Sequence, residues 1–216
     1  RIINQHIVCT ERMSYQYASF KLVRKNIENN KPEIPIEIYC IPDTHQTYVN
    51  NALGMTFGDR AKRFGEQIDV MRKLWSNRTV EYNGEFHKFE SAGINPESVQ
   101  RPIPVWIGAM KEVAVRRAAA IGDGWFMFPR QDPSDEAQKM ISLFRQSAVE
   151  AGKEPDDLGI NATVFANQGA GPSEWREVMN KWENMGANEL TFRTAESGLK
   201  NLDEHLQAIQ GMAKER

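Results

Sequence analysis

The feature that most constrains the fold of this chain is a regular alternation of short apolar runs and helix-like segments after residue 100. Four apolar runs predict buried strands, at residues 103–107, 124–128, 160–166 and 189–193. Apolar residues at helical spacing follow each run, over residues 111–121, 133–151, 173–185 and 202–212. Strands that alternate with helices predict a parallel sheet covered by helices. A doubly wound sheet and a (β/α)8 barrel both satisfy this pattern, and periodicity alone does not separate them.

The part of the chain before this alternation contains an amphipathic helix and a hairpin. Apolar residues recur in steps of three and four over residues 57–75, which predicts one apolar helix face. Residues 79–89 alternate in polarity around Asn83 and Gly84, a pair that favours a tight hairpin turn. Closer to the N-terminus, residues 34–41 are the best candidate for a further strand.

Composition and charge exclude several classes of protein. The 216 residues include 27 Lys and Arg against 29 Asp and Glu, so a net charge of −2 offers no basic field to nucleic acid. No apolar run approaches the ~20 residues that a membrane-spanning helix needs. The two cysteines, Cys9 and Cys40, have no metal-ligand spacing, and we interpret both as thiols in a reducing cytoplasm. We therefore expect a cytoplasmic protein that acts on a small molecule, with no metal, nucleic acid or membrane partner.

A series of short motifs carries a resemblance to a known family. The motifs are LGMTFGDR (53–60), RFGE (63–66), VEYNGEF (80–86), PESVQ (96–100), PIPVWIG (102–108) and AAAIGDGW (118–125). Each motif is weak alone, but in this order and at these separations the set resembles the luciferase-like monooxygenase superfamily of flavin- and deazaflavin-dependent enzymes. The resemblance covers residues 53–216 well and residues 1–52 weakly. It implies a single barrel domain over residues 1–216.

The resemblance implies a (β/α)8 barrel, the TIM-barrel fold, and the chain is short for one. A complete barrel needs roughly 250 residues. If Asp43 and His45 match the end of the family's second strand, the third and fourth strands are missing between residues 47 and 53. Either the protein has lost them or a segment is lacking from the chain. Because four strands cannot close a barrel, we expect an incomplete or gapped barrel of roughly six strands, with the extra ones supplied by residues 1–50.

The turn after residue 107 is the candidate cofactor site. We expect Gly108 to end a strand and a helix to begin near Met110 or Lys111, and the N–H groups at a helix N-terminus bind phosphate. In the resembled family, this strand end contacts the flavin phosphate or the ring edge. The resemblance therefore implies that Gly108, Ala109, Met110 and Lys111 bind FMN or a deazaflavin coenzyme. Lys111 replaces some of the attraction that the family's second glycine and small hydroxyl residues supply. The alternative is a tight turn without a ligand.

Three further residues are candidates for the reaction. The resemblance implies that His45 donates or accepts a proton near the flavin ring. Arg130 and Arg193 follow or close predicted strands, at the edge where ligand-binding loops belong, and a cation there binds an anionic substrate. The alternatives are a loop histidine, an exposed loop arginine and a surface ion pair. We interpret the other three histidines as surface residues: His6, His87 and His205.

The resemblance and the residues leave more than one function open. The first is a flavin-dependent oxidoreductase or monooxygenase, in which hydride transfer or oxygen activation occurs at the bound flavin and NAD(P)H is a candidate reductant. The alternative is a truncated, non-catalytic flavin-binding protein of the same fold. A third, unrelated phosphate-binding barrel would need a lysine or a carboxylate pair at strand ends, and the sequence shows none. The family and the apolar helix face at residues 57–75 predict a homodimer.

Overall fold

The computed structural model of the chain describes residues 5–8, 36–38, 56–95, 97, 101–127, 132–168 and 171–214, the first two ranges by backbone alone. The chain forms two compact units. The first, which we call the sheet unit, comprises Arg1–Tyr39 and Val105–Arg216, and the second, the hairpin unit, comprises Cys40–Pro104. The expectation of a single domain over residues 1–216 stays a prediction.

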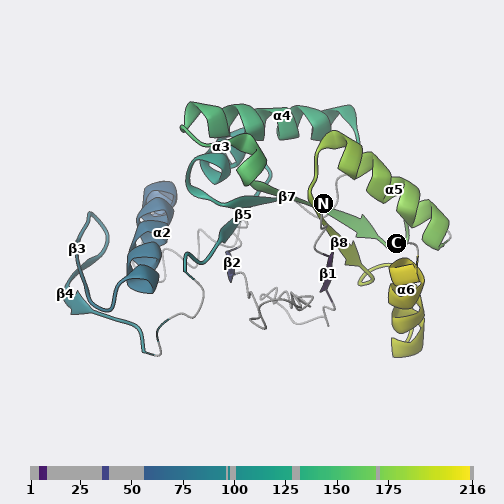
Figure 1. Cartoon of the computed structure of the whole chain (residues 1–216), viewed down its shortest axis with the longest axis horizontal. Coiled ribbons are helices and arrows are strands. Elements are labelled where there is room, and N and C mark those ends of the chain that lie inside the picture. Colours follow the sequence, from purple (N-terminus) through teal and green to yellow (C-terminus); the bar gives the residue numbers. More distant parts are fainter. Residues whose placement is uncertain are drawn as a thin grey trace. The chain divides into compact units, whose positions relative to one another are not determined.

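A six-stranded parallel sheet organises the sheet unit (Figure 1). Its strands lie in the order β1-β8-β7-β6-β5-β2, and every neighbouring pair is parallel. The strands are β1 (Gln5–Val8), β2 (Ile36–Ile38), β5 (Val105–Ala109), β6 (Gly124–Met127), β7 (Gly159–Phe165) and β8 (Glu189–Arg193). Within the described residues, β1 and β2 are the ends of the row and do not pair with each other. The described sheet is therefore open, which confirms the predicted gapped barrel. Residues 47–53, where we expected missing strands, lie outside the described residues.

Helices α3 (Glu112–Ile121), α4 (Asp135–Glu150) and α5 (Pro172–Met185) cover one face of the sheet, which we call the outer face (Figure 1). Aromatic pairs join strands to helices there. The ring centroids of Trp125 on β6 and Phe144 on α4 lie 5.3 Å apart, and those of Trp175 on α5 and Phe192 on β8 lie 4.8 Å apart. Because side chains alternate along a strand, the residues flanking Trp125 and Phe192 point to the opposite face, which we call the inner face.

A tryptophan side chain packs over two glycines and fills the inner face at the amino ends of the strands. The indole of Trp106 on β5 crosses Gly124 and Gly159, and a Cβ at either glycine would overlap its ring. Gly124 and Gly159 are register partners on β6 and β7, so the two strands leave one continuous space for the indole. Phe126 lies beside Trp106, with 5.4 Å between ring centroids. The inner face is therefore filled by aromatic packing at this end.

The position of β5 differs from the prediction by two residues. The strand covers Val105–Ala109, whereas the apolar run had predicted residues 103–107. Pro102 and Pro104 explain the shift, because proline has no N–H to donate to a neighbouring strand. Gly108 consequently lies inside the strand, in register with Phe126, and does not end it.

The start of α4 also differs from the prediction. The sequence favours Asp132 as the cap with Pro133 at the first helical position, but Ser134 is the N-cap, and its Oγ accepts a hydrogen bond from the N–H of Ala137 at 3.3 Å. The Asp132 carboxylate instead accepts a hydrogen bond from the Gln168 side chain, beyond the end of β7. Asp132 therefore contacts the segment that follows β7, and the helical pattern of the sequence does not predict this contact.

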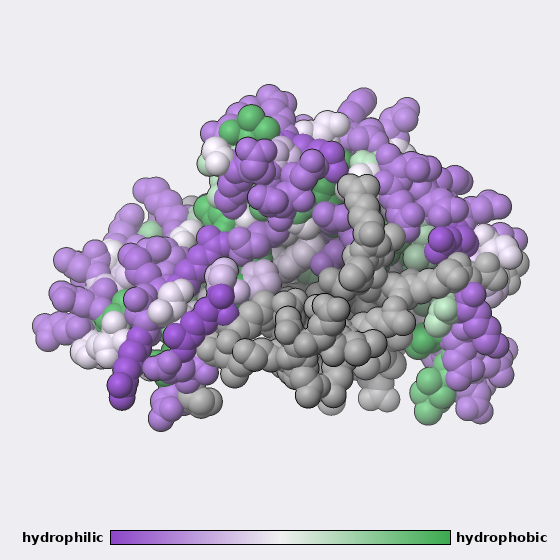
Figure 2. Space-filling model, in the orientation of Figure 1, coloured by the Kyte–Doolittle hydropathy of each residue, from purple (hydrophilic) through white to green (hydrophobic). Residues whose placement is uncertain are grey.

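The last helix, α6 (Leu202–Lys214), buries only part of the predicted face. The predicted stripe consists of Leu202, Leu206, Ile209 and Met212. Ala208 and Met212 are buried, whereas Leu202 and Leu206 are exposed, and hydrophobic residues show on the surface of α6 in Figure 2. His205, which we had interpreted as a surface residue, is half-buried. In the described part of the chain, no helix has the length and apolar character to cross a bilayer.

The hairpin unit confirms the predicted helix and hairpin. A short 3-10 turn, η1 (Phe57–Asp59), leads into α2 (Arg60–Ser76), and the antiparallel pair β3 (Val80–Asn83) and β4 (Lys88–Ala92) follows. Lys73 on α2 lies over the ring of Tyr82 on β3, 4.8 Å from its centroid, so side chains of the helix contact the hairpin.

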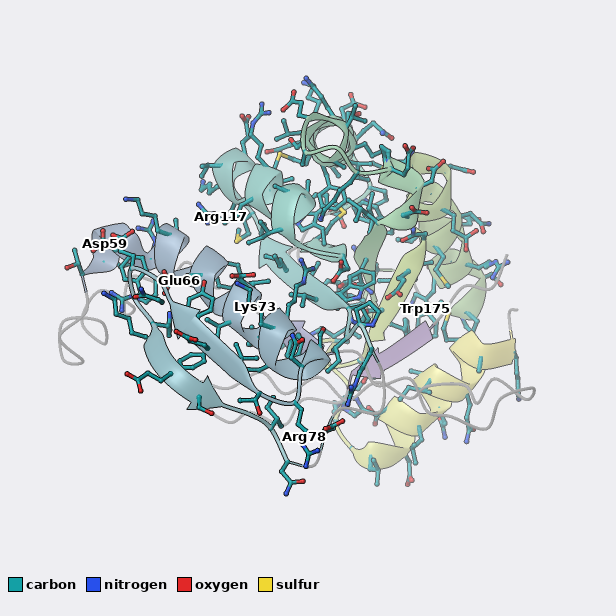
Figure 3. All side chains as sticks on the ribbon, turned by 60° about the vertical axis from the view of Figure 1, so that its left-hand side comes forward. Asp59, Glu66, Lys73, Arg78, Arg117 and Trp175 are labelled. Atoms are coloured by element: carbon teal, nitrogen blue, oxygen red, sulfur yellow. The ribbon has the colours of Figure 1, made fainter. Side chains whose placement is uncertain are left out.

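Glu66 joins α2 to the hairpin turn through its carboxylate (Figure 3). Its oxygens accept hydrogen bonds from the N–H groups of Glu85 at 2.8 Å, Phe86 at 2.9 Å and His87 at 2.6 Å. The Nδ1–H of His87 donates a fourth, at 2.8 Å. His87, predicted to be a surface residue, is therefore a half-buried part of this contact. Desolvation raises the pKa of the Glu66 carboxyl, but the hydrogen bonds from His87 and the backbone outweigh it, so the pKa lies below its ordinary value of 4.5.

The Trp106 packing predicts a large cost for a small substitution. In Gly159→Ala, the added methyl overlaps the indole, and such overpacking costs about 1–3 kcal/mol of unfolding free energy. Gly65→Ala is the control, because nothing lies within 4 Å of a Cβ placed there in α2. It should stabilise the protein by about 0.5–1 kcal/mol. Urea unfolding measures both, and equal stability of the two variants would contradict the packing described.

The Glu66 contact predicts a pH dependence of stability. A carboxyl whose pKa is lowered by folding contributes stability above its ordinary value of 4.5, and this contribution is lost as the pH falls from there through the folded-state pKa. Glu66→Gln should remove this component. The urea midpoint of the wild type should therefore exceed that of the variant at about pH 7, and the two midpoints should converge as the pH falls to about 3. Glu90→Gln, at an exposed position of β4, is the control and should keep the wild-type profile.

Candidate functional site

The carboxyl ends of the parallel strands place two of the predicted regions at one edge of the sheet. β5 ends at Ala109 and β8 ends at Arg193, and this edge of a parallel α/β barrel carries the active site. β6 and β7 lie between these strands, so β5 and β8 are about 14 Å apart at ~4.8 Å per strand spacing. The two regions therefore lie at the same edge of the sheet without direct contact, and they suit two different groups of the bound ligands.

The turn from β5 into α3 presents unpaired backbone donors. α3 begins at Glu112, one or two residues later than the predicted start at Met110 or Lys111, because Lys111 keeps an extended conformation with φ −98° and ψ 144°. The carbonyl of Lys111 accepts from the N–H groups of Ala114 and Val115, at 2.8 and 2.9 Å. No side chain caps the helix, and the N–H groups of Glu112 and Val113 have no partner within the helix. This N-terminus therefore offers donors and the positive end of the helix dipole to an anion.

The same turn exposes apolar side chains beside those donors. Met110 is 38% exposed and Val113 is 67% exposed, both unusually high for large apolar residues. Lys111 is exposed and adds a positive charge. Below them the strand end is fixed, because the Nε1–H of the buried Trp125 donates to the carbonyl of Ala109 at 3.0 Å. A rigid strand end thus carries N–H donors, one cation and an apolar surface.

Arg193 is held on the inner face with unused hydrogen-bonding capacity. The residue is 9% exposed, its guanidinium lies 5.6 Å from the ring centroid of Phe165, and one Nη lies 3.3 Å from the Glu196 carboxylate. Its Nε has no hydrogen-bond partner in the described structure. The ion pair that the sequence left as the alternative is present, with the exposed Glu196, although the guanidinium itself is largely buried. A buried arginine with a free donor is suited to binding an anionic group.

Asn161, Thr163 and Thr191 were not singled out from the sequence. They are buried polar residues in the middle of β7 and β8, and the Oγ1–H of Thr191 donates to Oδ1 of Asn161 at 3.1 Å. The strands had been interpreted as apolar throughout, whereas polar residues at every second position, Asn161 with Thr163 and Thr191 with Arg193, mark one face. That alternation is the signal in the sequence that identifies them.

The remaining predictions fall elsewhere. His45 and Arg130 lie outside the described residues, so their proposed roles stay predictions. Asp123 lies at the amino ends of the strands, where its carboxylate accepts from the N–H of Val105 at 2.7 Å. That contact fixes the start of β5 on the side of the sheet away from the candidate site.

Comparison with known proteins identifies the family. The model of the luciferase-like monooxygenase family matches residues 44–215, most of the chain. The chain belongs to the luciferase-like monooxygenase family. This confirms the resemblance drawn from the motifs and agrees with the parallel sheet of the chain.

Individual relatives of this luciferase-like chain match over shorter stretches. A protein of Mycobacterium tuberculosis is 37% identical over 101 residues, which cover 47% of this chain and 34% of the relative. An F420-dependent glucose-6-phosphate dehydrogenase of Mycolicibacterium gilvum is 31% identical over 102 residues, which cover 47% of this chain and 30% of the enzyme. The matched segment thus spans about a third of the length of these relatives.

A solved structure extends the fold comparison beyond those segments. The monooxygenase RslO1 from Streptomyces bottropensis aligns with a TM-score of 0.67 and 18% identity, over 84% of this chain and 67% of that protein. The luciferase-like chain therefore shares the barrel-type α/β fold of that enzyme, as its own sheet order indicates.

The residues at the β5–α3 turn fit the phosphate of a flavin or deazaflavin. The uncapped N–H groups of α3 and the exposed Lys111 attract a phosphate. Glu112, the one acidic residue in the first turn of α3, opposes this attraction. The exposed Met110 and Val113 supply apolar contact for a neighbouring part of the cofactor. A phosphate-bearing aromatic cofactor needs both features together.

Proposed function

We propose that this luciferase-like chain belongs to a flavin- or deazaflavin-dependent oxidoreductase that transfers a hydride or activates oxygen. The uncapped N-terminus of α3 at the carboxyl edge of β5 is the observation that carries the proposal. The named activity of the Mycolicibacterium gilvum relative supports a deazaflavin, and the wider family supports FMN as the other candidate.

The residues of the turn would hold the cofactor. The N–H groups of Glu112 and Val113 bind the phosphate together with the side chain of Lys111, while Gly108 and Ala109 bring the strand backbone close to it. When bound, the reduced flavin or deazaflavin supplies the electrons of the reaction. The protein's own part is to fix the phosphate, orient the ring and keep water from it.

The substrate would be a small molecule with an anionic group. Arg193 binds that group from the inner face, since its buried guanidinium has a donor to spare, and Arg130 is proposed as a second cation at the same edge. His45 is proposed to donate or accept the proton that accompanies electron transfer. NAD(P)H is the proposed reductant, and a cytoplasmic homodimer is the proposed state of the protein.

A non-catalytic flavin-binding protein is the second candidate. The observation that favours it is the open end of the described sheet between β1 and β2, since a barrel encloses its reaction only when its wall is complete. Flavin binding without NAD(P)H-linked turnover would select this candidate over the enzyme.

Binding of FMN and coenzyme F420 to charge-matched variants tests the proposal. Lys111→Glu places a negative charge beside the phosphate and should weaken binding roughly tenfold, the equivalent of about 1.4 kcal/mol. Lys181→Glu makes the same change at an exposed position near the C-terminal end of α5, toward the amino ends of the strands, and should bind like the wild type. Fluorescence titration measures both cofactors, and circular dichroism verifies that each variant is folded.

The outcomes separate the alternatives. Equal affinity of the two variants for the bound cofactor would remove the β5–α3 turn as the phosphate site. A wild-type protein that binds neither FMN nor F420 would overturn the proposed function itself.

A further inference from the structure

Asn161 carries an amide nitrogen whose hydrogen-bonding capacity the described protein does not use. Its residue is 0% exposed, at the centre of β7. The amide oxygen accepts from Thr191 at 3.1 Å, which orients the amide, while Nδ2 has no hydrogen-bond partner in the described structure. A buried donor without a partner costs stability, and a ligand that accepts a hydrogen bond from it would recover that cost.

The sheet register places this amide on the inner face. Asn161 is the register partner of Phe126, whose ring lies against Trp106 on that face. Neighbouring positions on the other face, such as Ile160, pair with the helix-packed Trp125. The free amide therefore points away from the helices, toward the side where Arg193 also has a free donor.

The register partners of Asn161 extend across the sheet to β5, the strand that precedes the candidate cofactor turn. Gly108 pairs with Phe126, and Phe126 pairs with Asn161, so β7 is two strand spacings, about 10 Å, from β5. Trp106 closes the amino end of this face, which leaves the carboxyl side of the row as the direction from which a ligand reaches Asn161. A cofactor that binds its phosphate at the N-terminus of α3 and extends along the inner face would place its ring on the side of the phosphate that faces Asn161.

We propose that the Asn161 amide, oriented by Thr191, donates a hydrogen bond to a ring carbonyl oxygen of the bound flavin or deazaflavin, an inference that rests on the proposed function. Both ring systems carry carbonyl oxygens, and a neutral amide donor suits them, whereas the phosphate is bound by the α3 N-terminus. Asn161 thereby recognises the ring and Lys111 recognises the phosphate, and the two contributions are separable by experiment.

The test compares FMN with riboflavin, which has the same ring and no phosphate. Asn161→Leu replaces the amide by an apolar group of similar size and should weaken both ligands roughly tenfold, as expected for one lost hydrogen bond. Lys111→Glu should weaken FMN and leave riboflavin unchanged. The same comparison applies to coenzyme F420 and 5-deazariboflavin. Infrared spectra of the bound ring should show a carbonyl band shifted to higher frequency in Asn161→Leu, because the oxygen has lost its donor.

Stability measurements exclude a merely structural role. Asn161→Leu also removes the acceptor of the buried Thr191 hydroxyl, so the stability comparison uses the double variant Asn161→Leu with Thr191→Val, which removes both partners of that hydrogen bond. The melting temperature of the double variant should equal or exceed that of the wild type, although ligand affinity falls. Unchanged affinity for FMN and riboflavin, with an unshifted carbonyl band, would overturn the inference. A wild type that binds no flavin or deazaflavin overturns the proposed function as well.

Discussion

The packing of Trp106 over Gly124 and Gly159 is the contact on which the arrangement of the sheet unit depends. The indole occupies the inner face at the amino ends of β5, β6 and β7, where neither glycine could carry a side chain. On the outer face, Trp125 on β6 packs against Phe144 of α4, and Trp175 of α5 packs against Phe192 on β8. Because the indole fills the inner face at its amino end, the proposed ligand would approach that face from the carboxyl edge.

The two faces of β7 and β8 have different chemistry as a result. The outer face is apolar, because it packs against the helices. Its buried residues include Ala162, Val164 and Leu190. The inner face carries Asn161, Thr191 and Arg193, polar groups that no helix requires. Buried polar groups on a sheet face are stable when they are hydrogen-bonded, and the two nitrogens there without a partner in the described structure, Asn161 Nδ2 and Arg193 Nε, are the donors that the proposed ligand would satisfy.

Local patterns in the sequence predict the elements of this fold well and their contacts poorly. The strand at residues 189–193 and the hairpin around Asn83 follow from apolar runs and turn chemistry within a few residues. The Glu66 contact was not predictable in this way, because its carboxylate and the N–H donors it binds are 19 to 21 residues apart. Asn161 was overlooked for a similar reason, since its amide is oriented by a hydrogen bond from Thr191 on another strand, 30 residues away in the sequence.

The central claim, that the cofactor binds at the carboxyl edge of β5, is tested most directly by the indole N–H signals of the tryptophans in a nitrogen-15 NMR titration with FMN or F420. The Trp125 indole donates to the carbonyl of Ala109 at that edge, so its signal should move as the cofactor saturates the protein. The indole of Trp182, buried on α5, should stay in place. A cofactor that saturates the protein while the Trp125 signal remains unchanged would contradict the account.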